Sequence, residues 1–240
     1  MTAFDSSHLR GGVIAAGQGT RLRVDGYPSS KAMTPVGRRP LIAHAVERFR
    51  AIGVRRVTII INEESDDCRQ WLERNVGDLD LDLIVRTTPS SYASFEIVAR
   101  RLAGEPALIT TVDSILPVED FRGFVRSAAA FPKDAVVLGV TTHVNDEKPL
   151  WATLDAQGRI RALGAESGSH VTAGLYWLPA FRPSAQRAHF ARLRDYLQWL
   201  ADRAPMYGVD LPIVFDIDRA CDVEEAEKSA RTRERESVEQ

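Results

Sequence analysis

The chain of 240 residues carries 31 lysines and arginines against 33 aspartates and glutamates, which gives a formal net charge of −2. This balance excludes the overall basic excess that drives nonspecific binding to nucleic acid, so we expect no nucleic-acid partner. The length is sufficient to bury an α/β core, and we predict a single domain over residues 1–240.

Cysteine usage and hydropathy bear on where the protein works. The two cysteines, Cys68 and Cys221, lie far apart and form no C-x-x-C pair, which argues against a zinc site or a disulfide framework. No run approaches about 18 apolar residues, and the N-terminus lacks a basic segment followed by an apolar one. We therefore expect a cytoplasmic protein with no membrane span and no signal peptide.

Apolar runs and helical spacings alternate along the first half of the chain. Strands are predicted at residues 11–16, 57–61, 81–85, 107–112 and 135–140, with helices at 40–53, from 65 through 72, from 90 or 91 through 102, and around 121–128. The apolar, β-branched run 57–61 is typical of a strand buried on both faces of a parallel sheet. The alternation predicts a mostly parallel, doubly wound (Rossmann-like) α/β sheet with helices on both faces.

The pattern changes after residue 150. Residues 151–154 and 159–163 flank the turn signal 155–158 and predict a small β-hairpin inserted in the same domain. A strand at 170–177, an amphipathic helix at 184–203, a last strand at 212–215 and a final helix capped by Asp222 are expected to follow. The tail, residues 229–240, is charged on all sides and is expected to fray.

A glycine loop with two spaced cations follows the first strand. Gly17 and Gly19 let the backbone take φ > 0 and approach a ligand, so that successive N–H groups can converge on phosphate oxygens. Arg21 adds a rigid guanidinium fork and Lys31 a mobile ammonium. The alternative is a tight corner with solvated cations, but the order of strand, glycines and cations favours a triphosphate site. Neither a P-loop nor a Rossmann fingerprint fits, because Leu22 stands where the third glycine would be.

The motif Gly17-x-Gly-Thr-Arg-Leu22, followed by Lys31-x-Met-x-Pro-Val36-x-x-x-Pro-Leu41, resembles the signature of the sugar-phosphate nucleotidyltransferases, the nucleoside-diphosphate-sugar pyrophosphorylases. The chain departs from it at Ser30, where the family usually has proline before the lysine. The resemblance implies a nucleotidyltransferase-type fold and a Mg²⁺-dependent enzyme. Such an enzyme transfers a nucleoside monophosphate from an NTP to a phosphorylated sugar or small phosphoalcohol and releases pyrophosphate.

The resemblance also implies which residues bind the nucleotide. The loop residues are Ala15, Ala16, Gly17, Gln18, Gly19, Thr20 and Arg21, joined by Ser91 and Ser94 from the helix that follows the third strand. Many hexose-specific relatives carry Gly-Thr-Ala near this helix. Ala93-Ser-Phe95 looks more like members that transfer CMP to phosphocholine or inositol phosphate, so a hexose 1-phosphate and a small phosphoalcohol both stay open as acceptors.

Carboxylates follow two of the predicted strands. Asp113 ends the strand 107–112, and Asp216 and Asp218 follow 212–215; ligands in open α/β sheets bind beyond such carboxyl ends. Paired carboxylates facing a phosphate loop would repel the substrate unless a hard cation lay between them, which predicts Mg²⁺ held by Asp113 with Asp216 or Asp218. The family's strand-closing aspartate matches Asp113 and its late acidic segment resembles 215–226. For Asp216, Asp218 and Asp222 the alternative is a helix cap plus surface charge.

Recognition of the acceptor rests on the later strand and its neighbours. Val171 to Tyr176 resembles the family's sugar-pocket strand, which implies contacts from Thr172 and Gly174, with Glu166 upstream accepting hydroxyls. Lys148, in Glu147-Lys-Pro149, is either a relocated phosphate contact or an accident of a polar loop. We predict an NTP-binding half over about 11–115 and an acceptor-binding half over about 135–220.

These parts predict a mechanism with Arg21, Lys31 and Asp113 as the catalytic set. An acceptor phosphate oxygen attacks the α-phosphorus in line, Arg21 and the loop amides hold the leaving phosphates, and Lys31 neutralises charge around the α-phosphate. Two alternatives stay open. A guanylyl transferase of molybdenum-cofactor maturation should lack the hairpin and the strand 171–176, and a nucleotide-sensing module would bind without turnover. The base, the acceptor and a possible homo-oligomer are not determined.

Overall fold

The computed structural model describes residues 8–27, 29–144, 148–181 and 190–238, and the side chains of 234–238 are outside this description. The main sheet contains β1 (Arg10–Ala15), β4 (Arg56–Ile61), β5 (Asp80–Val85), β6 (Ala107–Thr111), β8 (Val136–Thr141), β9 (Trp151–Leu154), β10 (Ile160–Leu163), β11 (His170–Leu178) and β12 (Met206–Asp210). Two small two-stranded sheets join β2 (Pro35–Val36) to β3 (Arg39–Pro40) and β7 (Ser114–Ile115) to β13 (Phe215–Asp216).

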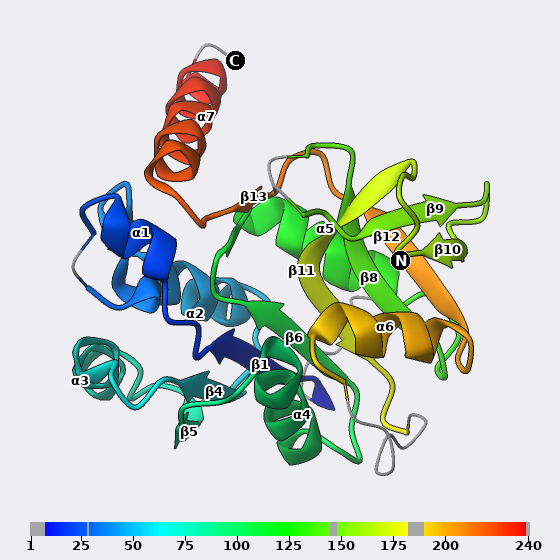
Figure 1. The fold of residues 1–240 in the computed structure, drawn as a ribbon, viewed down its shortest axis with the longest axis horizontal. Coiled ribbons are helices and arrows are strands. Elements are labelled where there is room, and N and C mark those ends of the chain that lie inside the picture. Colours follow the sequence, from blue (N-terminus) through cyan, green and yellow to red (C-terminus); the bar gives the residue numbers. More distant parts are fainter. Residues whose placement is uncertain (1–7, 28, 145–147, 182–189, 239–240) are drawn as a thin grey trace.

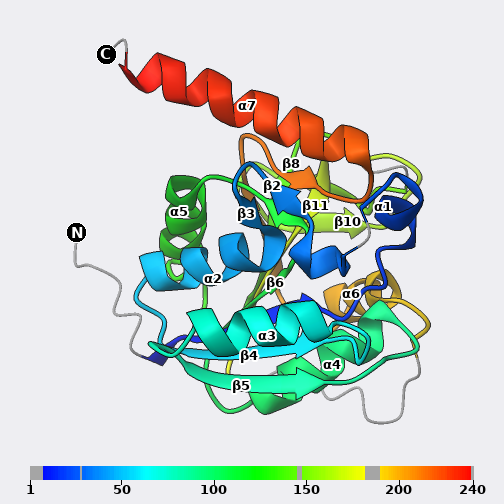
Figure 2. The same ribbon diagram turned by 90° about the vertical axis from the view of Figure 1, so that its left-hand side faces the viewer.

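The helices connect and cover these strands (Figure 1). They are α1 (Thr20–Val24), the 3₁₀ turn η2 (Lys31–Met33), α2 (Leu41–Ala51), α3 (Asp66–Asn75), α4 (Ser91–Arg101), α5 (Val118–Ala128), α6 (Leu193–Ala201) and α7 (Ala220–Val238). Buried side chains of α2, α3, α5 and α7 pack in one apolar cluster, and those of α4 and α6 in a second one. Figure 2 shows the sheet edge-on between α2 and α4. Helices therefore cover both faces of the sheet, as predicted.

The sheet is parallel in its N-terminal half. β5, β4, β1 and β6 are hydrogen-bonded in that order, all parallel, with Val13 of β1 opposite Ile59 on one side and Thr110 on the other. β11 then runs antiparallel to β6, β8 and β9, and β12 pairs parallel with β8. The predicted α/β fold is confirmed, and β9 and β10 form the predicted hairpin.

The prediction of a strand at 212–215 was wrong. The strand lies earlier, at β12, and only Phe215 and Asp216 of the later segment pair with β7. The glycine at the centre of β12 hid it, because Gly is depleted in strands. Here Gly208 allows close packing: a Cβ on it would lie 2.7 Å from Cδ2 of Leu154.

Two predicted helices differ in extent. α6 begins at Leu193, while residues 184–189 of the predicted helix 184–203 lie outside the described residues. α7 is helical to Val238, through most of the segment that was expected to fray, and it carries the chain away from the sheet (Figures 1 and 2). Asp222 is nearly buried in the first turn of α7, and its Oδ2 accepts hydrogen bonds from the backbone N–H groups of Asp218 and Arg219.

Candidate active site

The glycine loop leaves β1 at Ala15 and enters α1 at Thr20. Gly19 has φ 62°, and a Cβ placed on it would lie 2.7 Å from Cβ of Lys31. Gly17 does not have a positive φ, and its Cβ would meet only Cδ of Lys31, at 3.9 Å. The expectation of positive φ is therefore right for Gly19 and wrong for Gly17. Gly19 is required both by its backbone conformation and by the close approach of Lys31.

Replacing Gly19 by valine is expected to abolish nucleotide binding, because the side chain would push Lys31 away from the loop. Gly37 is a matched control, since its φ is 64° but nothing lies within 4 Å of the place that a Cβ would take. Gly37→Val carries the same backbone strain without the collision. Nucleotide affinity measured by titration calorimetry should fall below detection for Gly19→Val and change little for Gly37→Val. Equal nucleotide affinity in both variants would mean that the glycine loop is only a tight turn and does not bind the triphosphate.

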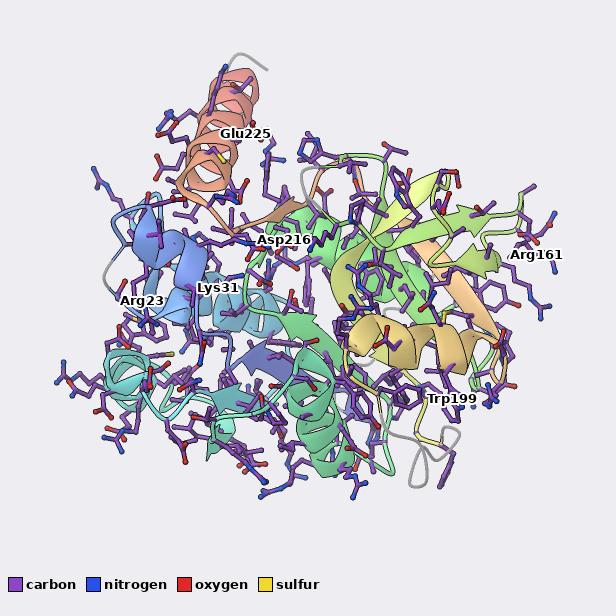
Figure 3. All side chains as sticks on the ribbon, viewed as in Figure 1. Arg23, Lys31, Arg161, Trp199, Asp216 and Glu225 are labelled. Carbon is purple, nitrogen blue, oxygen red and sulfur yellow. The ribbon has the colours of Figure 1, made fainter. Side chains whose placement is uncertain are left out.

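Lys31 lies at the centre of a charge network. Its Nζ donates to Oδ2 of Asp113 and to Oδ1 of Asp218, both at 2.5 Å, and Nη1 of Arg21 donates to the other oxygen of Asp218 at 2.8 Å. The Lys31 side chain is nearly buried, with 9% of its surface exposed. Figure 3 shows Lys31 and Asp216 in the middle of the molecule. The predicted loop cations and strand-end carboxylates are thus brought together.

Electrostatics explain why this lysine stays charged although it is buried. Burial by itself lowers the pKa of Lys31, but the carboxylates of Asp113, Asp216 and Asp218 outweigh it and raise that pKa above its ordinary value. Burial of Asp113 acts to raise its pKa; the charge of Lys31, the Lys31 hydrogen bond and a bond from Thr111 outweigh it and hold the pKa below its usual range. Both groups are therefore ionised at neutral pH.

The β7–β13 pairing brings the late aspartates to Asp113. Asp216 pairs with Ser114, the residue after Asp113, and the N–H of Ile217 donates to the carbonyl of Asp113 at 3.1 Å. Because Asp113 and Asp218 share one ammonium over two 2.5 Å contacts, their bonded oxygens lie no more than 5.0 Å apart. A short ladder thus joins segments separated by about a hundred residues of sequence, a contact that no local pattern predicts.

A cavity of about 400 Å³ opens beside this network. Of the residues predicted from the sequence, its lining includes Ser91, Asp113, Thr172, Gly174, Asp216 and Asp218. Sequence reasoning missed the polar groups Thr111, Ser114, Thr141, His143, Arg192 and Arg194, and assigned no contact to the Tyr176 side chain. The two arginines come from the start of α6, where the helical pattern gave no sign that the N-terminal end faces a cavity.

Tyr176 lies at the boundary between core and cavity. Its ring packs edge-on against Phe95, with 5.7 Å between ring centroids, while the residue also lines the cavity. Burial, followed by the charges of Asp113 and Asp216, raises the pKa of its phenol above the ordinary value. Tyr176 therefore stays a neutral hydroxyl at the cavity wall.

Other predicted site residues lie elsewhere. Ser94 is buried, with its Oγ 2.6 Å from Oγ1 of Thr88. Lys148 and Glu166 are exposed and are absent from the cavity lining, although the carbonyl of Lys148 accepts a hydrogen bond from Arg194. Ala15 and Ala16 are buried, and Thr20 is exposed. Gly17 and Gln18 line a second, smaller cavity of about 100 Å³ together with Arg23, Ser29, Ser30, Asn62, Glu64 and Ser65.

Gly174 lines the cavity at a bulge in β11. The register against β8 shifts between Thr172 and Tyr176, and Gly174 has φ 70°. A Cβ on Gly174 would lie 2.0 Å from Oγ of Ser114 and 2.5 Å from Oγ1 of Thr111. A side chain here would therefore press on the turn that carries Asp113.

Gly174→Ala is expected to lower the melting temperature by several degrees and to reduce kcat, because the methyl group must displace Thr111 and Ser114. Gly104→Ala is the matched control: its φ is 94°, and nothing lies within 4 Å of the added Cβ. Thermal melts and steady-state kinetics check both variants. Wild-type activity in Gly174→Ala would show that the turn tolerates the displacement.

The carboxylates are also candidate metal ligands. Within the described part of the chain, no group of three or more His, Cys, Asp or Glu side chains is arranged to hold a metal ion. Lys31 lies between Asp113 and Asp218 instead. Nevertheless, the carboxylates of Asp113, Asp216 and Asp218 gather around Lys31 and supply several anionic oxygen donors. That composition fits a hard divalent cation.

The helices of the described residues include none that is long and apolar enough to cross a membrane. The fold and the site together define a class: an α/β protein with a glycine loop at the end of its first strand and an acidic cluster facing that loop. The fold of this class is found among solved structures. The inositol-1-phosphate CTP transferase from T. maritima superposes with a TM-score of 0.79 at 18% identity, over 93% of this chain and 96% of that one. A UDP-glucose pyrophosphorylase gives 0.74 at 15% identity, over 93% and 98%.

Residues 11–200 match the model of the MobA-like NTP transferase domain, and the chain belongs to that family. The motif-based prediction of a nucleotidyltransferase is thereby confirmed. A glucose-1-phosphate thymidylyltransferase of Streptomyces griseus is 27% identical over 207 residues, 79% of this chain and 56% of that protein. The chain spans about half the length of this relative and of two further curated glucose-1-phosphate thymidylyltransferases that it matches. The likeness to the solved structures, at below 20% identity, shows the fold alone.

Proposed function

We propose that the chain transfers a nucleoside monophosphate from an NTP to a small phosphorylated sugar or alcohol and releases pyrophosphate. One observation carries this proposal: Lys31 and Arg21, beside the glycine loop, meet the carboxylates that line a cavity of about 400 Å³. The cations suit a triphosphate, and the cavity has the size of a small-molecule site. The transfer reactions that give the relatives their names are of the same kind.

On the nucleotide side, the triphosphate would compete with carboxylates for the two cations. Arg21 is half exposed, at 42% of its side chain, so its fork can turn to the leaving phosphates. Lys31 is held near Asp113 and would neutralise charge at the α-phosphate. Because a phosphate monoester is already anionic at neutral pH, the reaction needs positioning and charge neutralisation more than a general base.

On the acceptor side, the cavity has walls of opposite charge. Asp113, Asp216 and Asp218 line it from the segments around β7 and β13, and Arg192 and Arg194 line it from the start of α6. We assign the arginines to an anionic group of the acceptor, with Thr172 and the Tyr176 hydroxyl bonding its hydroxyls. Lys148 stays a candidate for binding the acceptor phosphate, because it lies next to Arg194: its carbonyl accepts a hydrogen bond from the Arg194 guanidinium.

A magnesium ion is part of this proposal. Asp113 and Asp218, which Lys31 holds close together, would bind it, with Asp216 beside them. When bound, the ion would supply charge neutralisation at the reacting phosphate oxygens. The Lys31 ammonium would then exchange its ion pairs with the carboxylates for ion pairs with the substrate phosphates. We also propose a cytoplasmic location, which the two free cysteines, Cys68 and Cys221, support.

A guanylyl transferase acting on the molybdenum cofactor is the second candidate, favoured by the name of the matching family. The hairpin β9–β10 and strand β11 argue for the first candidate, since the alternative was expected to lack both, and β11 supplies four consecutive cavity-lining residues, 171–174. A sensing module is the weaker alternative, because a full set of paired cations and carboxylates exceeds what binding alone requires.

The experiment is a pyrophosphate-release screen of CTP, UTP, GTP and dTTP against phosphorylated sugars, inositol phosphate, phosphocholine and a pterin phosphomonoester, with Mg²⁺ present. The proposal expects release with at least one sugar or small alcohol, in equimolar amount with a nucleoside-diphosphate product seen by mass spectrometry. Turnover with GTP and the pterin alone would establish the second candidate. NTP binding without any release would identify a sensor.

A further inference from the structure

Arg48 is a charged residue in the core behind the proposed site. It lies on α2, is 1% exposed, and is among the largest fully buried side chains of the described residues. Its guanidinium lies over the ring of Phe121 at 5.6 Å, and the neighbouring Phe49 meets the same ring edge-on at 5.7 Å. An apolar side chain would therefore suit these surroundings, and a cation here needs an explanation.

Within the described residues, the Arg48 guanidinium donates a hydrogen bond to a single backbone carbonyl. Nη1 donates to the carbonyl of Ser114 at 2.5 Å, whereas Nε and Nη2 are buried without a hydrogen-bond partner among the described residues. No salt bridge of Arg48 is found in that part of the chain. Burial lowers its pKa to about 10, opposed by the charge of Asp113. The group stays charged at neutral pH, yet it is costly to bury.

Ser114 links Asp113 to the segment that carries Asp216 and Asp218. It follows Asp113 directly, pairs with Asp216 across the β7–β13 ladder, and its Oγ lies 2.7 Å from Oγ1 of Thr111. The other side of the turn is limited by Gly174, where even a methyl group would collide with Ser114. A shift of the Ser114 carbonyl would therefore move Asp113 and Asp216 together.

We infer that Arg48 is a positioning residue, which fixes the 111–115 turn through the Ser114 carbonyl and so sets the geometry of Asp113 and Asp216. It lines neither of the two cavities described above and acts through the turn. This inference deepens the proposed function and rests on it. Small displacements of reacting groups can lower turnover about 10²-fold while binding is retained. On this inference, the buried cation with its unpaired N–H groups serves to position the turn and not to stabilise the fold.

The test compares Arg48→Met, Arg48→Lys and the control Arg50→Met. Methionine keeps the length of the side chain and suits the aromatic surroundings, so the melting temperature should be equal to or above that of wild type. The value of kcat should fall about 10- to 100-fold, with KM for both substrates within about threefold. Lysine can reach a single carbonyl and should restore part of kcat. Arg50, on the same helix, pairs with Asp78 at the surface and should have no effect.

Hydrogen–deuterium exchange of residues 111–117 gives a readout that does not need activity. Exchange there should rise in Arg48→Met, rise less in Arg48→Lys and stay unchanged in Arg50→Met. If wild type shows no turnover, the proposed function fails, while the exchange result still tests the role of Arg48. If Arg48→Met does not fold, Arg48→Lys tests the inference instead: its kcat should lie below that of wild type, and its exchange at residues 111–117 should lie above it. A kcat within about twofold of wild type, or unchanged exchange at 111–117, overturns the inference.

Discussion

Replacing Lys31 by alanine is expected to lower kcat/KM for nucleotidyl transfer by at least ~10²-fold. The Lys31 ammonium has two roles. In the structure it balances the negative charges of Asp113 and Asp218, and in the proposed reaction it would neutralise the charge of the transferring phosphate. Its removal leaves two carboxylates facing the triphosphate. Both kcat and nucleotide affinity should therefore fall, measured by pyrophosphate release and by titration calorimetry.

Lys133→Ala is the matched control for this substitution, because Lys133 is exposed and lies outside both cavities. It should keep wild-type kinetics. Lys31→Arg is a second probe: it retains the charge but places a larger fork beside Gly19, so only part of the activity should return. If Lys31→Ala kept its nucleotide affinity, Lys31 would serve only to balance the aspartates.

Asp113→Asn is expected to fold and to lose turnover about 10²-fold or more, because it removes one anionic oxygen donor without opening a cavity. The magnesium concentration that gives half-maximal rate should rise in parallel. Asp134→Asn, at an exposed position, is the control. Normal activity with a normal magnesium titration would exclude Asp113 as a metal ligand.

The same variant tests the ion pair through stability. The lowered pKa of Asp113 stabilises the folded state above its ordinary pKa near 3.8, and this contribution is lost as the pH falls through the lower folded value. The melting temperature of wild type should therefore exceed that of Asp113→Asn most at neutral pH, and the difference should shrink below about pH 4. A difference independent of pH would mean that the carboxylate charge does not stabilise the fold.

The elements of the first half could be predicted because local signals coincide there. The β-branched run of β4, the Ser90 cap whose Oγ accepts from the N–H of Ala93, and the spacing of α5 are all local, and the structure shows each of them. β12 could not be predicted, since Gly208 lowers strand propensity and is tolerated only because Leu154 and Val140 pack closely against it. That packing is tertiary and absent from any local window.

The candidate site likewise contains residues that the sequence could predict and residues that it could not. The glycine loop, Lys31 and Asp113 carry a recognisable motif with a fixed order, and the structure brings them together. The roles of Arg192 and Arg48 are not encoded locally: one faces a cavity from a helix end, the other reaches a carbonyl 66 positions away. Amphipathic periodicity treats both as ordinary helix residues. Only the fold identifies the atoms that they meet.

In the proposed reaction, an oxygen of the acceptor phosphate attacks the α-phosphorus of the nucleotide. With the substrate pair found in the screen, the acceptor phosphate is labelled with ¹⁸O and the products are analysed by mass spectrometry and ³¹P NMR. We predict that all of the label stays in the nucleoside-diphosphate product, including its bridging oxygen, and that the pyrophosphate is unlabelled. Label in the pyrophosphate, or release of orthophosphate in place of pyrophosphate, would be incompatible with this reaction.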